Sequence, residues 1–204
     1  MKYIKKLPDT DKALSEKLTL NNWKKIKEPS NFTWTILLST PFMLINGAIE
    51  MFIFYNLYTP LQDFLKSNEG FNITLELHLV TLLFIPVIFI FMTIHEFLHA
   101  CFIPNVLKSD KTYWGINGIC GFVTTSEKIK KSRFLLISIM PLLLLSIVLP
   151  FVLNAFGWLN GYTIFLCLLN AMGSCVDCLN MCLIATQVPN GAYVLNNGFE
   201  TYFK

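Results

Sequence analysis

The chain has 204 residues, of which 54% are hydrophobic and only 14% are charged, against about 25% charged residues in an average soluble domain. Together with a mean hydropathy of +0.54, this composition excludes an ordinary soluble globular protein and indicates an integral membrane protein whose first partner is the lipid bilayer. The formal net charge of +3 is too small to suggest a nucleic-acid partner.

The first 32 residues form a polar, basic segment that carries eight lysines. A cleavable secretory signal has a short charged region and an apolar core of about 7–15 residues, and this segment fits neither feature. We therefore expect residues 1–32 to remain on the protein as a cytoplasmic N-terminal segment.

Four apolar runs reach the length of about 20 residues that crosses a bilayer. They are Thr33–Tyr58, Leu75–Ile103, Phe134–Phe156 and Trp158–Ile184. Pro86 and Pro141 lie inside the second and third runs, where proline is expected to kink a membrane helix. The connection between the third and fourth runs is very short, so these two helices should be adjacent and antiparallel. The sequence predicts an all-α membrane protein with four transmembrane helices over residues 33–184 and a cytoplasmic C-terminal tail over 185–204.

The distribution of basic residues predicts the orientation. Segment 104–133 carries six basic residues, whereas segment 59–74 carries Lys66 alone and the last connection carries none. By the positive-inside rule, both chain ends and segment 104–133 are cytoplasmic, and we expect the protein in a bacterial cell membrane. Glycine and Asn-Gly within Tyr113–Thr125 suggest a short hairpin between the second and third helices. This hairpin is either a plain surface loop or an exposed strand that holds an extended substrate.

The second apolar run contains His95-Glu96-Phe97-Leu98-His99, which fits the pattern H-E-x-x-H. On a helix, residues at i and i+4 share a face, so both imidazoles can bind one metal ion while Glu96 acts as general base on a water molecule. Ionisable residues inside a membrane are rare and generally functional. The alternative is that the histidines only bond neighbouring helices and that Glu96 is protonated.

A catalytic zinc usually has three protein ligands, and the third should lie at the same membrane depth as the histidines. At 1.5 Å per residue, His99 lies about 6 Å from the inner end of its run, and Asp177 lies about 10 Å from the inner end of the fourth run. The sequence therefore predicts His95, His99 and Asp177 as metal ligands. Asn170 shares a helix face with Asp177 and is a candidate donor to a substrate carbonyl or its oxyanion; the alternative is that it only links helices.

Other ionisable residues fit the site less well. His78 lies about 25 Å from His95 along the same helix, and Glu50 lies nearer the outer side, where it is expected to be a buried, protonated packing group. Cys175, Cys178 and Cys182 follow i, i+3, i+7 spacing and share a face away from Asp177. A thiolate in place of Asp177 remains an alternative, although small buried hydrophobes are the ordinary role of such cysteines.

The HEFLH motif late in the second run, with N-x6-D and GSxxD in the last, resembles the zincin-peptidase family of small multi-pass membrane proteins, over most of the chain beyond the basic segment. It is similar, more distantly, to the site-2 intramembrane metalloproteases. The resemblance implies one Zn²⁺ per chain held by His95, His99 and Asp177, with Glu96 as the catalytic base. Site-2 proteases typically have Leu-Asp-Gly where this chain has Val-Asp-Cys, which limits that likeness to the general arrangement.

The leading hypothesis is a membrane-embedded zinc endopeptidase that hydrolyses peptide bonds of a membrane protein or peptide near the cytoplasmic face. One alternative is a non-proteolytic membrane protein with a structural or sensory metal site. Another is a metal-dependent hydrolase of a lipid-linked substrate. Glu96 favours hydrolysis, because a structural metal site needs no general base beside its ligands.

Overall fold

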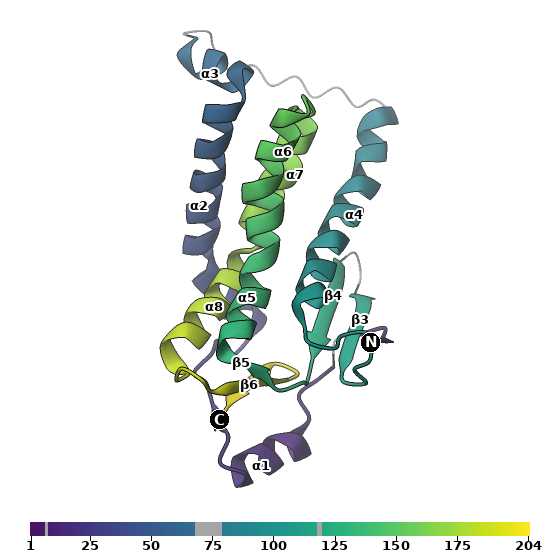
Figure 1. Cartoon of the computed structure of the whole chain (residues 1–204), viewed down its shortest axis with the longest axis vertical. Helices are drawn as coiled ribbons and strands as arrows, with labels where there is room; N and C mark the ends of the chain where they lie inside the picture. The colour runs from purple at the N-terminus through teal and green to yellow at the C-terminus, as the bar shows by residue number, and fades with distance from the viewer. Residues whose placement is uncertain (7, 68–78, 118–119) are drawn as a thin grey trace.

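The computed structural model describes residues 1–6, 8–67, 79–117 and 120–204 (Figure 1). Its helices are α1 (Lys12–Leu20), α2 (Phe32–Leu57), α3 (Thr59–Lys66), α4 (Leu79–Phe102), α5 (Lys131–Leu142), the π-helical segment η1 (Leu143–Val148), α6 (Leu149–Ala155), α7 (Gly161–Gly173) and α8 (Cys175–Gln187). Its strands are β1 (Lys2–Tyr3), β2 (Lys24–Lys25), β3 (Thr112–Asn117), β4 (Cys120–Thr125), β5 (Ile129–Lys130), β6 (Tyr193–Asn197) and β7 (Glu200–Phe203).

Four helical segments are long and apolar enough to cross a membrane, as the sequence predicts. They are Thr33–Leu57, Leu82–Phe102, Lys131–Ala155 and Gly161–Gln187. The start of the second predicted run, with His78, lies outside the described residues. The third segment consists of α5, η1 and α6, and the fourth of α7 and α8. Since α5 contacts α8 and α6 contacts α7, the last two segments are adjacent and antiparallel, as predicted.

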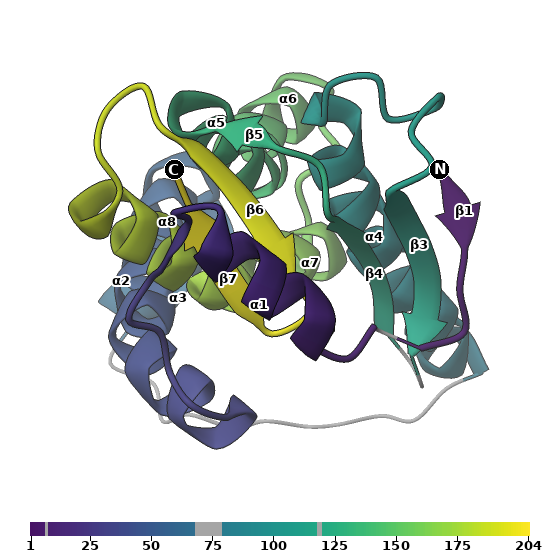
Figure 2. The ribbon, with the colours of Figure 1, turned by 90° about the horizontal axis from the view of Figure 1, so that it is seen from below.

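The prediction of an all-α fold was wrong at one end of the molecule, where one β-sheet lies beside the last turns of α4 and another lies beneath the helices (Figures 1 and 2). One sheet has the strand order β1-β3-β4 and includes the two strands of the predicted hairpin; residues 118–119 lie outside the described residues. The other has the order β2-β7-β6-β5. Several of these strands have only two residues, so the sequence carries no alternating pattern long enough to reveal them.

The second sheet joins the two ends of the chain, because β2 pairs with β7. The Lys25 ammonium lies 2.7 Å from the Glu200 carboxylate, and hydrogen bonds from Lys25, Ser15 and Tyr202 lower the pKa of Glu200 to about 2. The predicted N-terminal segment and C-terminal tail are therefore parts of one folded unit.

Alternate side chains of β6 face opposite sides of this sheet, as the period of two requires. Val194 packs against Ile184 and Val188 at the end of α8. Leu195 packs against Trp23 on the other face, where α1 covers the sheet. The sheet thus lies between α1 and the ends of the apolar helices (Figure 1).

Lys131, the first residue of α5, is buried and holds the end of α8. Its ammonium donates to the carbonyl oxygens of Ala185 at 2.8 Å and Val188 at 2.6 Å, and to Asn190 Oδ1 at 3.3 Å. The last carbonyls of a helix have no partner within the helix and carry partial negative charge, so the ammonium satisfies them and ties the third apolar segment to the fourth.

We expect Lys131→Met to lower the free energy of unfolding by about 2 kcal/mol, because it leaves these carbonyls without a charged donor. Unfolding of the purified protein in detergent micelles measures the change. Lys130→Met is the matched control, since Lys130 is exposed, and it should cost no more than about 0.5 kcal/mol. Equal losses in the two variants would rule out the capping role.

Candidate metal centre

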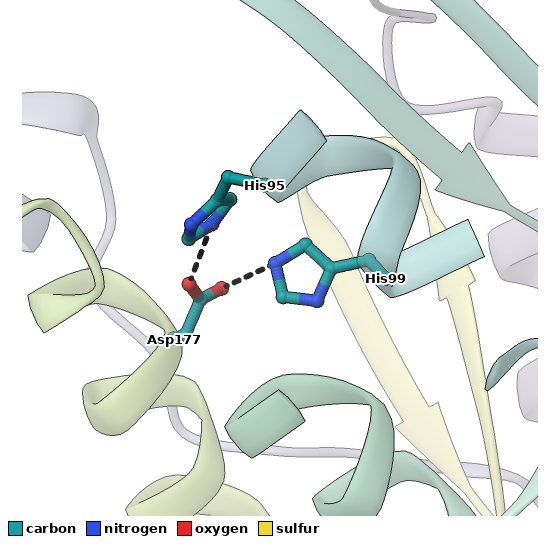
Figure 3. Close-up of side chains that lie close together, drawn as sticks. All are labelled: His95, His99 and Asp177. Carbon is teal, nitrogen blue, oxygen red and sulfur yellow. Dashed lines mark ion pairs between the residues drawn. The ribbon is translucent and has the colours of Figure 1, made fainter. Parts of the chain in front are cut away.

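The structure brings the three predicted metal ligands together from two apolar segments (Figure 3). His95 and His99 lie one turn apart on α4, and Asp177 reaches them from α8. His95 Nε2 lies 3.3 Å from Asp177 Oδ2, and His99 Nε2 lies 3.4 Å from Asp177 Oδ1. Two ligand atoms bound tetrahedrally at about 2.1 Å from a zinc ion lie about 3.4 Å apart, so the spacing of this donor set fits zinc.

Both imidazoles are oriented by acceptors on their other nitrogen. His95 Nδ1 lies 2.8 Å from Asn170 Oδ1, and His99 Nδ1 lies 2.8 Å from the Ile137 carbonyl oxygen. Because these oxygens only accept, each Nδ1 carries a proton, and a metal ion would bind the lone pair of each deprotonated Nε2 on the side of Asp177. Metal-binding histidines generally have this arrangement, in which an outer acceptor fixes the tautomer and the ring.

The Ile137 carbonyl is available to His99 for a reason that lies in the sequence. In an α-helix this carbonyl accepts from the N–H four residues later, and that residue is Pro141, which has no N–H. The backbone of α5 therefore presents an acceptor inside an apolar helix bundle, and the His99 imidazole satisfies it.

Asn170 is fully buried, and its amide group is occupied by the protein. Its Nδ2 donates to the Pro141 carbonyl at 3.2 Å and to Ser146 Oγ at 2.8 Å, while its Oδ1 accepts from His95. Ser146 lies in η1, and π-helical turns are frequent at functional sites. The predicted contact of Asn170 with a substrate oxyanion is not supported, because both amide protons already have acceptors; this geometry supports an orienting role toward His95.

A break in the fourth apolar segment places Asp177. Helix α7 ends at Gly173, and the backbone N–H and the hydroxyl of Ser174 each donate to the Asn170 carbonyl at 2.9 Å. Helix α8 then begins at Cys175, so Asp177 lies in its first turn, where the positive end of the helix dipole favours a carboxylate. This region also approaches the second apolar segment, since Gly173 lies beside Met92 of α4.

Glu96, the predicted general base, is half-buried beside the histidines and contacts the hairpin. Its Oε2 accepts a hydrogen bond of 3.1 Å from the Val123 N–H of β4. Val123 of β4 pairs with Trp114 of β3. The Trp114 carbonyl accepts a hydrogen bond from the Ile4 N–H, which lies on the side of β3 opposite to β4. The Trp114–Val123 pair is therefore a non-hydrogen-bonded one, and the N–H and C=O of Val123 point away from β3. A backbone group has no sequence signature, so residue patterns could not reveal this contact.

The two cysteines nearest Asp177 face another helix. Cys175 Sγ lies 3.5 Å from Ser39 Oγ, and Cys178 Sγ lies 3.5 Å from Asn46 Nδ2, both on α2. The geometry therefore gives no support to a thiolate ligand in place of Asp177.

Glu50 also lies apart from the group of potential ligands, which consists of His95, His99 and Asp177. Its side chain is completely buried on α2, and neither carboxylate oxygen has a hydrogen-bond partner in the part of the chain that the structure describes. The burial of Glu50 agrees with the predicted packing group, and Glu50 is not among the residues of the centre.

Comparison with known proteins adds one finding. The family described as "Putative zincin peptidase" matches residues 88–193, more than half of the chain. The matched region contains the H-E-x-x-H motif, Asn170 and Asp177, and a zincin family implies zinc as the metal. Searches of curated proteins and of solved structures found no match.

We expect the purified protein to hold about one zinc per chain and to lose most of it in His95→Ala, His99→Ala or Asp177→Ala, because two remaining ligands hold the ion weakly. Asn170→Ala should lower zinc affinity by about 10–100-fold, since the His95 ring loses its orienting acceptor. Metal analysis and chelator competition measure both effects. Cys178→Ala is the control and should keep its zinc; loss of zinc there, with retention in Asp177→Ala, would identify a thiolate ligand instead.

Proposed function

The chain belongs to the "Putative zincin peptidase" family, and we propose that it is a membrane-embedded zinc endopeptidase, which hydrolyses peptide bonds of a membrane protein or peptide near the cytoplasmic face. One observation carries this proposal: His95, His99 and Asp177 converge from two apolar segments, and Glu96 follows His95 on α4. A structural or sensory metal site needs no general base at that position.

In the proposed mechanism, zinc would act on the carbonyl and the water molecule, and residues of the chain transfer the proton and orient the ligands. Zinc bound by the two histidines and Asp177 would polarise the scissile carbonyl and lower the pKa of a water molecule at the site. Glu96 takes a proton from the attacking water as its oxygen bonds to the carbonyl carbon. Glu96 then passes that proton to the amide nitrogen as the C–N bond breaks. Asn170 and the Ile137 carbonyl hold the imidazoles in place throughout.

The outer edge of β4 supports a peptide as the substrate rather than a lipid-linked molecule. β4 is a terminal strand of its sheet, and no described strand pairs with its outer edge. In an antiparallel pair, every second residue of a strand directs its N–H and C=O away from the partner strand. Gly121 and Thr125 therefore direct these groups away from β3, as Val123 does, toward the side on which Glu96 lies. An extended peptide can add to such an edge, and a helical substrate must unwind first because its carbonyls are hydrogen-bonded within the helix.

The arrangement of the polar elements supports a cytoplasmic location of the site. Both sheets, α1 and the two chain ends lie at one end of the apolar helices (Figure 1), and 14 of the 16 basic residues belong to segments 1–32 and 104–133. We infer from the positive-inside rule that this end is cytoplasmic. His99 lies three residues before the end of α4 on the same side, so the metal centre is close to that membrane face.

We expect Glu96→Gln to keep its zinc while hydrolysis falls by about two orders of magnitude or more, because the amide preserves the shape but accepts no proton. Comparative proteomics of membranes that contain wild type or this variant identifies the accumulating substrate, and turnover is then measured on purified protein. If the variant turned over that substrate at the wild-type rate, the peptidase mechanism would be excluded and a structural metal site would be the remaining explanation.

The contact between Val123 and Glu96 allows a second test. Val123→Pro removes the N–H that donates to Glu96, so we expect turnover to fall by about tenfold or more, as for a lost hydrogen bond to a charged group. Val123→Ala keeps the N–H and should stay within about twofold of wild type. Zinc content should be unchanged in both, and equal turnover in both would show that the N–H has no role.

A further inference from the structure

A large cavity lies on the side of the second sheet that faces away from the helix bundle. Its volume is about 830 Å³, and its walls come from α1, the base of the β3–β4 hairpin, β6 and the residue after β7. Figure 2 shows α1 crossing this face of the sheet. Nothing in the zinc centre lines the cavity, so it is a separate feature of the molecule.

Four lysine side chains surround the cavity. Lys17 comes from α1, Lys111 and Lys128 come from the hairpin base, and Lys204 follows β7. No aspartate or glutamate is among the lining residues, and none of the four ammonium groups makes an ion pair with the described residues. The Lys204 ammonium donates to the Asn21 carbonyl at 2.9 Å, and the α-carboxylate of Lys204 lies at the same wall, so the unmatched positive charge comes from Lys17, Lys111 and Lys128.

The interior of the cavity is apolar. Leu14, Leu18, Trp23 and Leu195 line it, and all four belong to the cluster between α1 and the sheet. The Lys128 ammonium lies 5.4 Å from the centre of the Trp23 ring. Sites for small molecules typically have volumes of about 300–1,000 Å³ and combine mostly apolar walls with a few convergent polar groups, and this cavity has both properties.

We propose that the cavity binds a small organic phosphate of the nucleoside di- or triphosphate class. The phosphates contact the lysines, and the apolar part of the ligand packs on the leucines and Trp23. Lysine binds phosphate as a compact point charge, and several lysines match the several charges of a di- or triphosphate. Because the sheet separates the cavity from the apolar helices, its ligand comes from solution rather than from the lipid headgroups.

The test is calorimetric titration of the full-length protein, in detergent micelles at about 0.15 M salt, with ATP, ADP and pyrophosphate and without added divalent metal. We expect ATP to bind with a Kd below about 1 mM and pyrophosphate to bind more weakly, because it lacks an apolar part. The double variant Lys17→Gln/Lys111→Gln should weaken ATP binding by about tenfold or more. Neither side chain makes a hydrogen bond or ion pair with the described residues, so the variant should fold normally.

The matched control is Lys12→Gln/Lys24→Gln, which removes the same charge from exposed lysines outside the cavity and should change the Kd by less than about twofold. Equal weakening in the two double variants would show general charge attraction and overturn the site. The absence of ATP and ADP binding to wild type would also overturn it. Binding of a polyglutamate peptide in place of the phosphates would assign the surface to an acidic protein segment instead.

Discussion

The metal centre depends on the requirement that every polar group inside the apolar bundle finds a partner. Three departures from regular helix meet this requirement together. Pro141 frees the carbonyl that orients His99, the π-helical segment presents Ser146 to Asn170, and the break at Ser174 puts Asp177 in a first helical turn. Each departure would be costly in an isolated membrane helix. Together they supply the acceptors and donors that hold one carboxylate against two imidazoles.

The two β-sheets at the polar end of the molecule contact the helices that carry this centre. The hairpin contacts Glu96 through the Val123 N–H, and the second sheet contacts α8 through Val194, beside the cap that Lys131 of α5 forms on the end of α8. Glu96 and the helix that carries Asp177 are thus contacted by different sheets. If the helices formed without the two sheets, the residues of the centre would still be present, but they would lack the contacts that fix their geometry.

Hydropathy alone predicted the four apolar segments, and helical spacing predicted His95, His99 and Glu96. The depth argument added Asp177 because the fourth segment contains one acidic residue. Of the sheets, the sequence predicted the β3–β4 hairpin alone, because β1, β2 and β5 have only two residues and no readable period, and β1 and β2 pair with residues more than a hundred positions away. The sequence left two alternatives for Asn170, because its amide could serve a substrate or another helix; the packing of three helices around it favours the second.

The pairing of β2 with β7 constrains how the protein can be made. β2 emerges early from the ribosome, but Lys24 pairs with Phe203, nearly the whole chain later. At roughly 5–20 residues per second, the strand waits about ten seconds or more for its partner. An unpaired strand is open to wrong pairing during that time, and lysine is the residue that most often protects exposed edges. Both residues of β2 are lysines, so the strand whose partner is synthesised last has charged side chains that oppose aggregation during synthesis.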